Sequence, residues 1–394
     1  MSSRVLRVLI VAGEASGDLH AAKLAAALRE AAPQIEFDLF GAAGPRMREV
    51  GVDAVVRSDG LSVIGLPEIG RALPMFWRAF KALKTAARER KADVAVLVDF
   101  PDFNLKLARA LKRQGVRVVY YISPQLWAWR SYRRRTIRKY VDLLITILPF
   151  EKDWYARHGI ENVEYVGSPL AREVFASRAR EEFCRDHGLD AARPIVSLLP
   201  GSRHKEIVKI LPAMLDAAEL LRRRRADLQM LLPLGSEKNA ADAREILRDR
   251  PAGERLQVIV GETYDALNAS DAAAIASGTA TLEAGIIGTP MAIVYKTTSL
   301  NYKLLRPLIS VEHFGLINLI AGERIANELI QNDLTPQALA DEIERLLEPD
   351  TNALVRERLR AATDKLGHGG ASRRAAEAIL KLAGVAAGDQ PAPS

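Results

Sequence analysis

The stretch VLIVAGEASGD at residues 8–18 indicates the class of fold. Its first five residues form an unbroken apolar run, as in parallel strands that are buried on both faces. A loop containing two glycines follows, and the pattern of residues 19–32 predicts a helix. A strand, a loop and a helix in this order are the repeating unit of a doubly wound α/β sheet.

The same unit recurs along the chain. Short runs rich in valine, isoleucine and leucine predict further strands at 37–41, 94–98, 116–122, 143–148 and 164–167, and then at 195–199, 230–233, 256–260, 273–275 and 291–295. Further helices are expected at 75–90, 104–113 and 151–158. Such repetition favours two Rossmann-like domains that face each other across a cleft, the default ligand site in open parallel sheets.

Two domains also fit a chain of 394 residues. We place the first at residues 1–170 and the second at residues 171–383, with the last helices packing either within the second domain or back on the first. Residues 384–394 are rich in glycine, alanine and proline, and we expect a disordered tail there.

Charge and composition restrict the classes of function. The formal net charge is +7, which favours an anionic partner: a nucleic acid, a membrane surface or a phosphorylated substrate. The single cysteine, Cys184, excludes a disulfide framework, and the six histidines lack metal-binding spacing, so we expect neither a metal nor another cofactor. We also expect no signal peptide and no transmembrane helix.

A candidate anion site is LPGSR at residues 199–203, between a predicted strand and a helix. Gly201 lets the backbone approach a ligand, Ser202 can cap the helix, and Arg203 brings a permanent charge with a bidentate fork. A phosphate at the helix N-terminus fits this pattern better than a plain turn with a surface arginine.

A second loop of the same kind is SGTATLE at residues 277–283. Ser277, Gly278 and Thr279 open a helix whose first N–H groups could bind another phosphate. Glu283 lies one turn after Thr279 on the same helix face, where a carboxylate could accept both hydroxyls of a ribose. A capped helix is the structural alternative, but beside the first loop this one suggests a nucleotide diphosphate.

Carboxylates follow two of the predicted strands. Asp99 comes directly after a strand and could act as a general base, whereas Asp102 is expected to cap the following helix; two structural turn aspartates are an equally good interpretation. Glu14, Ser16 and Asp18 in the first loop suit a ligand rich in hydroxyl groups, although Asp18 also fits the N-cap of its own helix.

An apolar segment with interleaved basic residues covers residues 61–88. It suits a lipid ligand or a membrane surface, while a helix that packs on the sheet is the structural alternative. Its apolar members are Val63, Ile64, Leu66, Ile69, Leu73, Met75, Phe76, Trp77 and Phe80, and its basic members are Arg71, Arg78, Lys81, Lys84 and Arg88. Basic clusters at residues 130–139 and 222–225 could also contact anionic lipid.

Eight motifs in order give the chain a resemblance to a known family. They are VAGEASGD (11–18), GAAGPRM (41–47), DFPDFN (99–104), SPQLWAWR (123–130), LPFE (148–151), LPGSR (199–203), SGTATLE (277–283) and NLIAGE (318–323). The set resembles the lipid-A-disaccharide synthase family of inverting glycosyltransferases with the GT-B fold.

The resemblance implies a reaction. UDP-2,3-diacylglucosamine would be the donor and 2,3-diacylglucosamine 1-phosphate the acceptor, giving a β-1,6-linked disaccharide and UDP without a metal. The enzyme would act at the cytoplasmic face of the Gram-negative inner membrane, as a peripheral protein on anionic phospholipid. Monomer and homodimer both stay open, and nucleic acid is not an expected partner.

The resemblance also implies roles for residues. The base would be Asp99, and the nucleotide would contact Arg203, Ser277, Gly278, Thr279, Glu283 and Asn318. Within SPQLWAWR, the candidates for contact with the sugars are Ser123, Gln125 and Trp127. The chain departs from the family at Ser168, where histidine is frequent, and at Ile317 and Asn327, where proline is common.

Two alternatives from other classes remain. A soluble UDP-sugar epimerase on the same fold would explain both nucleotide loops but not the apolar segment at residues 61–88. A nucleic-acid-binding protein would fit the basic charge, although the sequence contains no known binding module.

Overall fold

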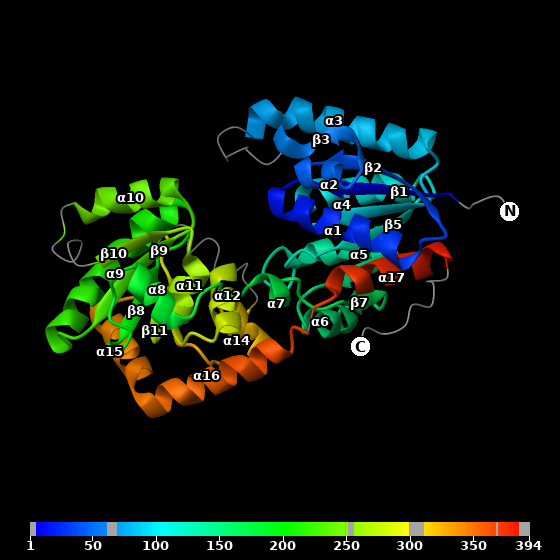
Figure 1. Cartoon of the computed structure of the whole chain (residues 1–394). Helices are drawn as coiled ribbons and strands as arrows, with labels where there is room; N and C mark the ends of the chain where they lie inside the picture. The colour runs from blue at the N-terminus through cyan, green and yellow to red at the C-terminus, as the bar shows by residue number, and fades with distance from the viewer. Residues whose placement is uncertain are drawn as a thin grey trace. The chain divides into compact units, whose positions relative to one another are not determined.

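The structure is a computed structural model, shown in Figure 1. It describes residues 5–60, 69–248, 250, 256–298, 311–367 and 369–385, without the side chains of residues 60 and 69–72. Contacts divide the chain into two units, one formed by Met1–Pro169 with Gly369–Ser394 and the other by Leu170–His368. The division after Pro169 lies one residue from the boundary placed from the sequence. Of the expected tail, residues 386–394 lie outside the described residues.

A seven-stranded parallel sheet in the order β3-β2-β1-β4-β5-β6-β7 forms the centre of the first unit. Its strands are β1 (Val5–Ala12), β2 (Glu36–Ala43), β3 (Asp53–Arg57), β4 (Val94–Val98), β5 (Arg117–Tyr121), β6 (Leu143–Thr146) and β7 (Val163–Tyr165). The winding direction reverses between β1 and β4, where an open sheet binds its ligands. Ala12 pairs with Val98, so the loops after these two strands leave the sheet at the same level.

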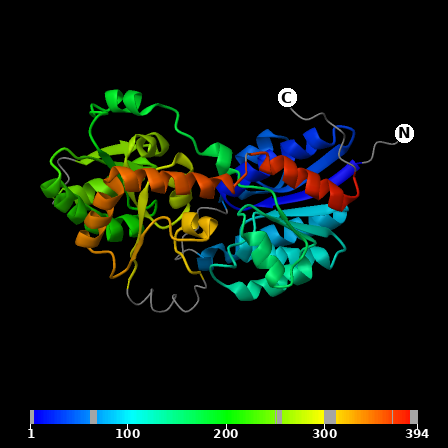
Figure 2. The same ribbon diagram turned by 90° about the horizontal axis from the view of Figure 1, so that it is seen from below.

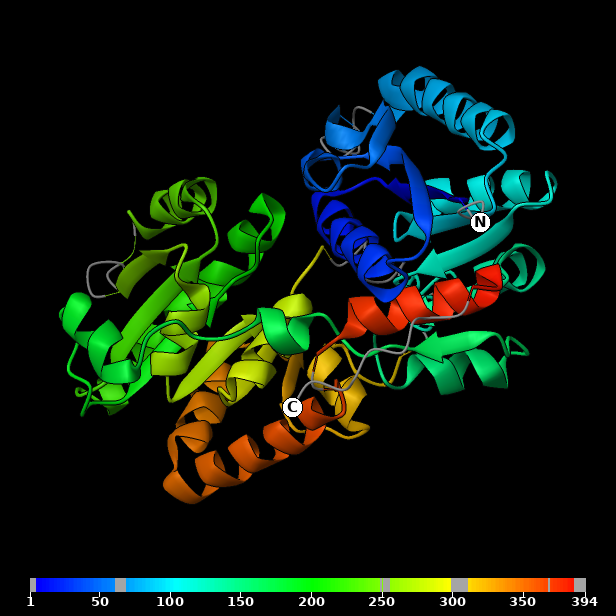
Figure 3. The same cartoon turned by 45° about the vertical axis from the view of Figure 1, so that its right-hand side comes forward.

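Helices cover both faces of this sheet. Helices α1 (Ala15–Ala31) and α17 (Ala371–Ala383) contribute to the apolar core on one face. The other face is covered by α3 (Ile69–Glu89), α4 (Pro101–Lys112), α5 (Arg134–Tyr140) and α6 (Glu151–Arg157). Figures 2 and 3 show α17 in red against the blue start of the chain, so the last described helix completes the first unit.

The second unit has a six-stranded parallel sheet in the order β10-β9-β8-β11-β12-β13. Its strands are β8 (Ile195–Leu199), β9 (Gln229–Leu234), β10 (Leu256–Val260), β11 (Ala272–Ala276), β12 (Met291–Tyr295) and β13 (Glu328–Ile330). The helices described around it are α7 (Leu170–Glu173), α8 (Arg180–Asp186), α9 (His204–Arg224), α10 (Glu237–Leu247), α11 (Thr263–Ala269), α12 (Thr279–Ile287), α14 (Leu316–Ala321), α15 (Pro336–Leu347) and α16 (Pro349–Asp364). Here the winding reverses between β8 and β11.

The predicted class, two doubly wound α/β sheets, is confirmed. Two edge strands were not predicted: β3 has no fully buried residue, and β13 is only three residues long. Helix α3 begins before Pro74 rather than after it, so proline lies inside the helix. Among the described residues, no helix is long and apolar enough to cross a membrane.

Asp18 connects the start of α1 to α2, the helix that follows the neighbouring strand β2. Its carboxylate accepts hydrogen bonds from the backbone N–H groups of Gly44 and Arg46, both at 2.8 Å, and of Met47 at 3.3 Å. These groups open α2 (Pro45–Glu49), so the prediction that Asp18 caps its own helix is wrong: it caps α2 from the first turn of α1. Both of its oxygens are therefore engaged within the protein.

Replacing Asp18 by alanine should destabilise the first unit by about 2 kcal/mol, because three backbone N–H groups lose their acceptor. All four tryptophans lie in this unit, so tryptophan fluorescence during urea unfolding reports on it alone. As a control, Asp59→Ala removes an exposed ion pair with Arg48 and should shift the midpoint little. Equal midpoints for the two variants would contradict this role of Asp18.

Candidate active site

A pair of carboxylates lies at the switch point of the first sheet. Asp99 follows β4, and Glu14 follows the neighbouring strand β1. Burial raises the pKa of Asp99 to about 6, with a further upward contribution from the negative charge of Glu14 and a downward one from a hydrogen bond with the Phe100 backbone. A carboxylate of this pKa can accept a proton efficiently near neutral pH.

The backbone at Asp99 is strained. Asp99 and Phe100 have φ angles of 46° and 51°, in the left-handed region that residues with side chains seldom adopt. The buried Asn104 amide donates to the carbonyls of Val98, at 3.2 Å, and of Asp99, at 2.8 Å. The Tyr120 hydroxyl also donates to the Asp99 carbonyl, at 2.6 Å. These three hydrogen bonds fix the direction in which Asp99 leaves the sheet.

The turn places the Phe100 ring over the loop after β1. A Cβ atom on Gly13 would lie 2.4 Å from Phe100 Cδ1, so glycine is required there by space. The same ring stacks on Phe103, with centroids 5.6 Å apart, and its centroid lies 6.1 Å from that of Phe76 on α3. The turn that contains Asp99, the loop after β1 and α3 thus meet at one aromatic cluster.

Asp102 has a different role from the one predicted. The N-cap of α4 is Phe100 and forms no side-chain cap, so the expectation that Asp102 caps this helix is wrong. Asp102 is 71% exposed and forms ion pairs with Arg130, at 3.1 Å, and with Arg133.

Two of the SPQLWAWR candidates hydrogen-bond to a buried acid. The Ser123 hydroxyl and the Trp127 indole N–H donate to the same oxygen of Glu151, at 2.8 and 3.0 Å. The other Glu151 oxygen accepts from the Leu148 backbone at 3.1 Å. Burial raises the pKa of Glu151, and these hydrogen bonds oppose the rise. Ser123 and Trp127 therefore hold the loop, whereas Gln125 between them is exposed, as is Ser16 in the first loop.

The loop after β8 forms its own helix cap. Glu206 accepts from the backbone N–H groups of Ser202, at 3.2 Å, and Arg203, at 3.3 Å. A Cβ atom on Gly201, whose φ is 115°, would lie 2.5 Å from the same Glu206 oxygen. The expected anion site at this helix N-terminus is thus filled by the protein's own carboxylate. Arg203 pairs with Glu206 at 3.1 Å yet stays 83% exposed.

Helix α12, which follows the loop after the adjacent strand β11, has no side-chain cap at its N-terminus. Gly278 and Thr279 are exposed there, and the Ser277 hydroxyl donates to the Phe314 carbonyl at 2.8 Å. One turn along α12, Glu283 accepts from the Tyr264 hydroxyl at 3.2 Å. Burial raises the pKa of Glu283, and the hydrogen bond from Tyr264 opposes the rise.

Asn318 is fully buried, and its side-chain amide forms four hydrogen bonds within the protein. Its Nδ2 donates to the Ala326 carbonyl and to Glu328, and its Oδ1 accepts from the Ile325 and Ala326 backbone, all at 2.8–2.9 Å. Asn318 is therefore placed to shape the loop between α14 and β13. The neighbouring Ile317 packs on α12, where a Cβ atom on Gly285 would lie 2.7 Å from it.

Part of the apolar segment is exposed on α3. Leu73 and Trp77 are 61% and 65% exposed, and the Lys81 ammonium lies 5.6 Å from the centre of the Trp77 ring. Met75 and Phe76 are half-buried. Val63, Ile64 and Leu66 lie outside the described residues, as does the side chain of Ile69.

Sequence reasoning missed Glu151, Glu206 and Tyr264. Glu206 alone left a local signal, since it occupies the third helical position after an N-terminal loop, the spacing of a capping box. Among the described residues, no three His, Cys, Asp or Glu side chains gather to hold a metal ion.

Solved structures show how widely this architecture is used. A UDP-GlcNAc 2-epimerase from Neisseria meningitidis, bound to UDP-GlcNAc, is similar with a TM-score of 0.61 and 14% identity, over 96% of this chain and 100% of that one. A calicheamicin glycosyltransferase matches with a TM-score of 0.56 and 16% identity, over 98% and 99% of the two chains. These likenesses establish the GT-B α/β fold, and they leave the reaction open.

Sequence comparison decides the reaction class. The lipid-A-disaccharide synthetase family model matches residues 8–382. A lipid-A-disaccharide synthase from Trichlorobacter lovleyi is 43% identical over 96% of this chain and 98% of its own length. One from Syntrophus aciditrophicus is 44% identical over 95% and 97%. These matches favour the glycosyltransferase over the epimerase and the nucleic-acid-binding protein, and the chain belongs to the lipid-A-disaccharide synthase family.

Proposed function

We propose that the chain transfers 2,3-diacylglucosamine from UDP-2,3-diacylglucosamine to 2,3-diacylglucosamine 1-phosphate, with Asp99 as general base. The supporting observation is the Asp99 carboxyl group at the β1/β4 switch point, with its pKa raised to about 6, in a chain of this family. The products are the β-1,6-linked disaccharide 1-phosphate and UDP, formed with inversion.

In the proposed step, the acceptor's 6-hydroxyl oxygen attacks the anomeric carbon of the donor. The new oxygen–carbon bond forms as the bond from that carbon to the UDP oxygen breaks, and UDP leaves with the electron pair. Asp99 takes the hydroxyl proton. The strained turn aims the carboxylate before substrate binds, so less ordering is needed at the moment of reaction.

Charge that develops on the leaving diphosphate needs stabilisation without a metal. The first N–H groups of α12 are the better candidates, because that helix has no side-chain cap whereas Glu206 fills the start of α9. We assign the diphosphate to Gly278 and Thr279, with Arg203 adding a permanent charge and Glu283 accepting the ribose hydroxyls.

The lipid substrates require access to a membrane, and α3 supplies a surface suited to one. Leu73, Trp77, Lys81, Lys84 and Arg88 are all exposed and follow one another at intervals of three or four residues, so they form one stripe. We name these five the α3 stripe. Apolar and cationic side chains side by side fit the headgroup region of an anionic membrane, so we place the chain peripherally at the cytoplasmic face of the inner membrane.

The reaction is tested with the two named substrates in detergent, with EDTA present, by mass spectrometry. We expect UDP and the disaccharide. Asp99→Asn should keep its affinity for UDP and lose about 10²–10⁴-fold in turnover, the usual contribution of a general base. Asp102→Asn on the same turn is the matched control and should lose far less. If the folded wild-type chain forms no disaccharide, the proposed reaction is wrong. If Asp99→Asn keeps near-normal turnover, Asp99 is not the general base.

The pH dependence of kcat/KM tests the electrostatics separately. Activity should rise with pH through about 6, because only ionised Asp99 accepts a proton. Glu14→Gln should move this acidic limb, the rise of kcat/KM with pH, to lower pH, since the substitution removes a negative charge that raises the pKa of Asp99. Glu30→Gln, at the exposed far end of α1, should leave it in place. A limb that does not move in Glu14→Gln would show that the two carboxylates do not interact.

Membrane attachment is tested by sedimentation with vesicles that contain anionic phospholipid. Leu73→Ser/Trp77→Ser should weaken recruitment by about tenfold or more, since two exposed apolar side chains no longer enter the interface. The control is Phe175→Ser/Leu354→Ser, which removes two similarly exposed side chains from the second unit. If both double variants bind as the wild type does, the membrane contact lies elsewhere.

A further inference from the structure

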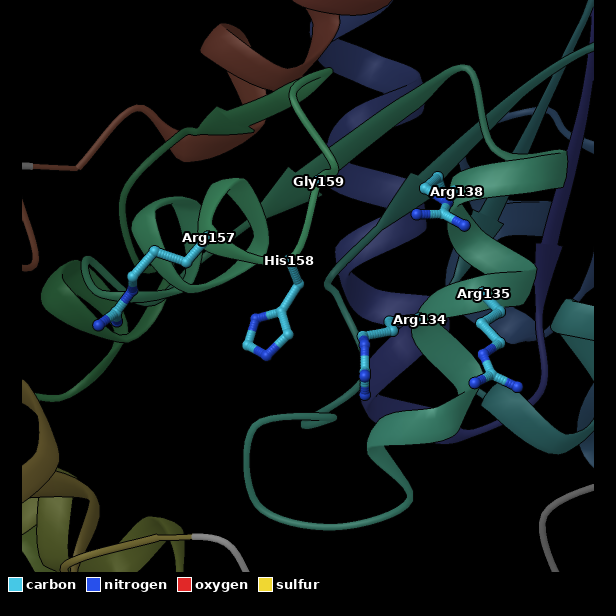
Figure 4. A pocket seen from close by; sticks show the side chains of 6 residues that line it. All are labelled: Arg134, Arg135, Arg138, Arg157, His158 and Gly159. Atoms are coloured by element: carbon cyan, nitrogen blue, oxygen red, sulfur yellow. The ribbon is translucent and has the colours of Figure 1, made fainter.

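A pocket lined with arginine lies between α5 and α6 of the first unit. Its cavity volume is about 510 Å³. The lining residues are Arg134, Arg135, Arg138, Arg157, His158 and Gly159. Figure 4 shows His158 beside Arg134 in the middle of the group, with Arg135 and Arg138 on α5 to one side and Arg157 at the end of α6 on the other.

The four arginines have no acidic partner within the part of the chain that the structure describes. None of them forms an ion pair there, although ion pairs join many other arginines, such as Arg130 and Arg133 just before them. Arg134 donates to the Ser131 carbonyl at 3.1 Å and Arg157 to the Asp153 carbonyl at 3.3 Å. Each guanidinium has five N–H donors, so most donors remain available to a ligand.

Helix dipoles account for only half of this cluster, because Arg138 and Arg157 lie in the last turns of α5 and α6, where positive charge is favourable. Arg134 and Arg135 stand in the first turn of α5, at the end of a helix dipole where positive charge is unfavourable. Four like charges around one cavity also repel one another. An anion bound in the cavity would remove both penalties.

His158 adds a further polar group. Its Nδ1 lies 2.7 Å from the Trp154 carbonyl, which can only accept, so Nδ1 is the nitrogen that carries hydrogen. The ring packs on Trp154 with centroids 4.2 Å apart, which holds its orientation. This leaves Nε2 as the ring nitrogen available to a ligand.

We propose that this pocket binds the phosphate group of a phosphomonoester. A doubly charged phosphate with three terminal oxygens can accept hydrogen bonds from more than one guanidinium group, so it matches this concentration of positive charge better than a carboxylate does. The cavity has the volume of a site for a whole small molecule, so the ligand extends beyond the phosphate. A soluble phosphate ester and a phosphomonoester lipid headgroup share this chemistry. The pocket shares no residue with the Asp99 turn or the α3 stripe, and its binding test uses neither substrate of the proposed reaction, so the proposal can fail while that reaction stands, and the reverse.

The first arm of the test uses a soluble probe, with the full chain titrated with glycerol 3-phosphate by calorimetry and with glycerol as the blank. The second arm uses phosphatidylcholine vesicles with phosphatidic acid, a phosphomonoester, compared with phosphatidylglycerol, a diester. Arg134→Gln/Arg138→Gln should weaken binding by about tenfold or more in the arm that carries the natural source. Weaker binding of glycerol 3-phosphate by the variant identifies a soluble ester as the ligand. Weaker binding to the phosphatidic acid vesicles alone identifies a lipid headgroup.

The matched control is Arg185→Gln/Arg244→Gln, which removes the same charge from side chains that are 73% and 54% exposed in the second unit and that lie outside both basic clusters. It should bind as the wild type does, because the α3 stripe is intact in every variant. If the pocket variant unfolds at a lower temperature, Arg135→Gln/Arg157→Gln replaces it, since both side chains are exposed. No binding in either arm, or equal binding by the pocket and control variants, would overturn the proposal.

Discussion

The hydrogen bonds from the Asn104 amide to the carbonyls of Val98 and Asp99 are the constraint on which the candidate active site depends. They stabilise a turn in which two successive residues with side chains adopt positive φ. Each such residue costs roughly 1–3 kcal/mol, so the turn persists only because its surroundings determine it. Burial raises the pKa of Tyr120, with a further contribution from the charge of Asp99, so its hydroxyl stays protonated and donates to the same carbonyl.

That turn connects structure to electrostatics. Because β1 and β4 are neighbours, the loops after them bring Glu14 and Asp99 close enough for one charge to affect the other. The Phe100 ring covers Gly13 and contacts Phe76 of α3, so the helix that carries the α3 stripe packs directly on the turn that contains Asp99. In the second unit, adjacent strands β8 and β11 present one helix start filled by Glu206 and one without a side-chain cap. For this reason we propose the start of α12, rather than that of α9, as the site of the diphosphate.

Sequence reasoning recovered the sheets because buried parallel strands are continuous apolar runs, as β4 and β8 illustrate. It missed β3 and β13, which are short edge strands with weak patterns. It identified Asp18 and Asp102 as residues of turns, but not their partners, which lie more than 25 residues away along the chain. The resemblance directed attention to Asn318, and only the tertiary structure shows that its amide is engaged within its own loop. The raised pKa of Asp99 likewise depends on burial and on strand order, which no local pattern encodes.

We propose that the fold prepares Asp99 as a general base before substrate binds. The most direct test is a ¹³C NMR titration of the free, full-length chain with labelled aspartate carboxyl groups, in which the Asp99→Asn variant identifies the Asp99 signal. We expect this carboxyl group to titrate near pH 6, about two units above an ordinary aspartate. Titration near pH 4 would contradict it, because the turn would then leave Asp99 as exposed to water as any surface carboxylate.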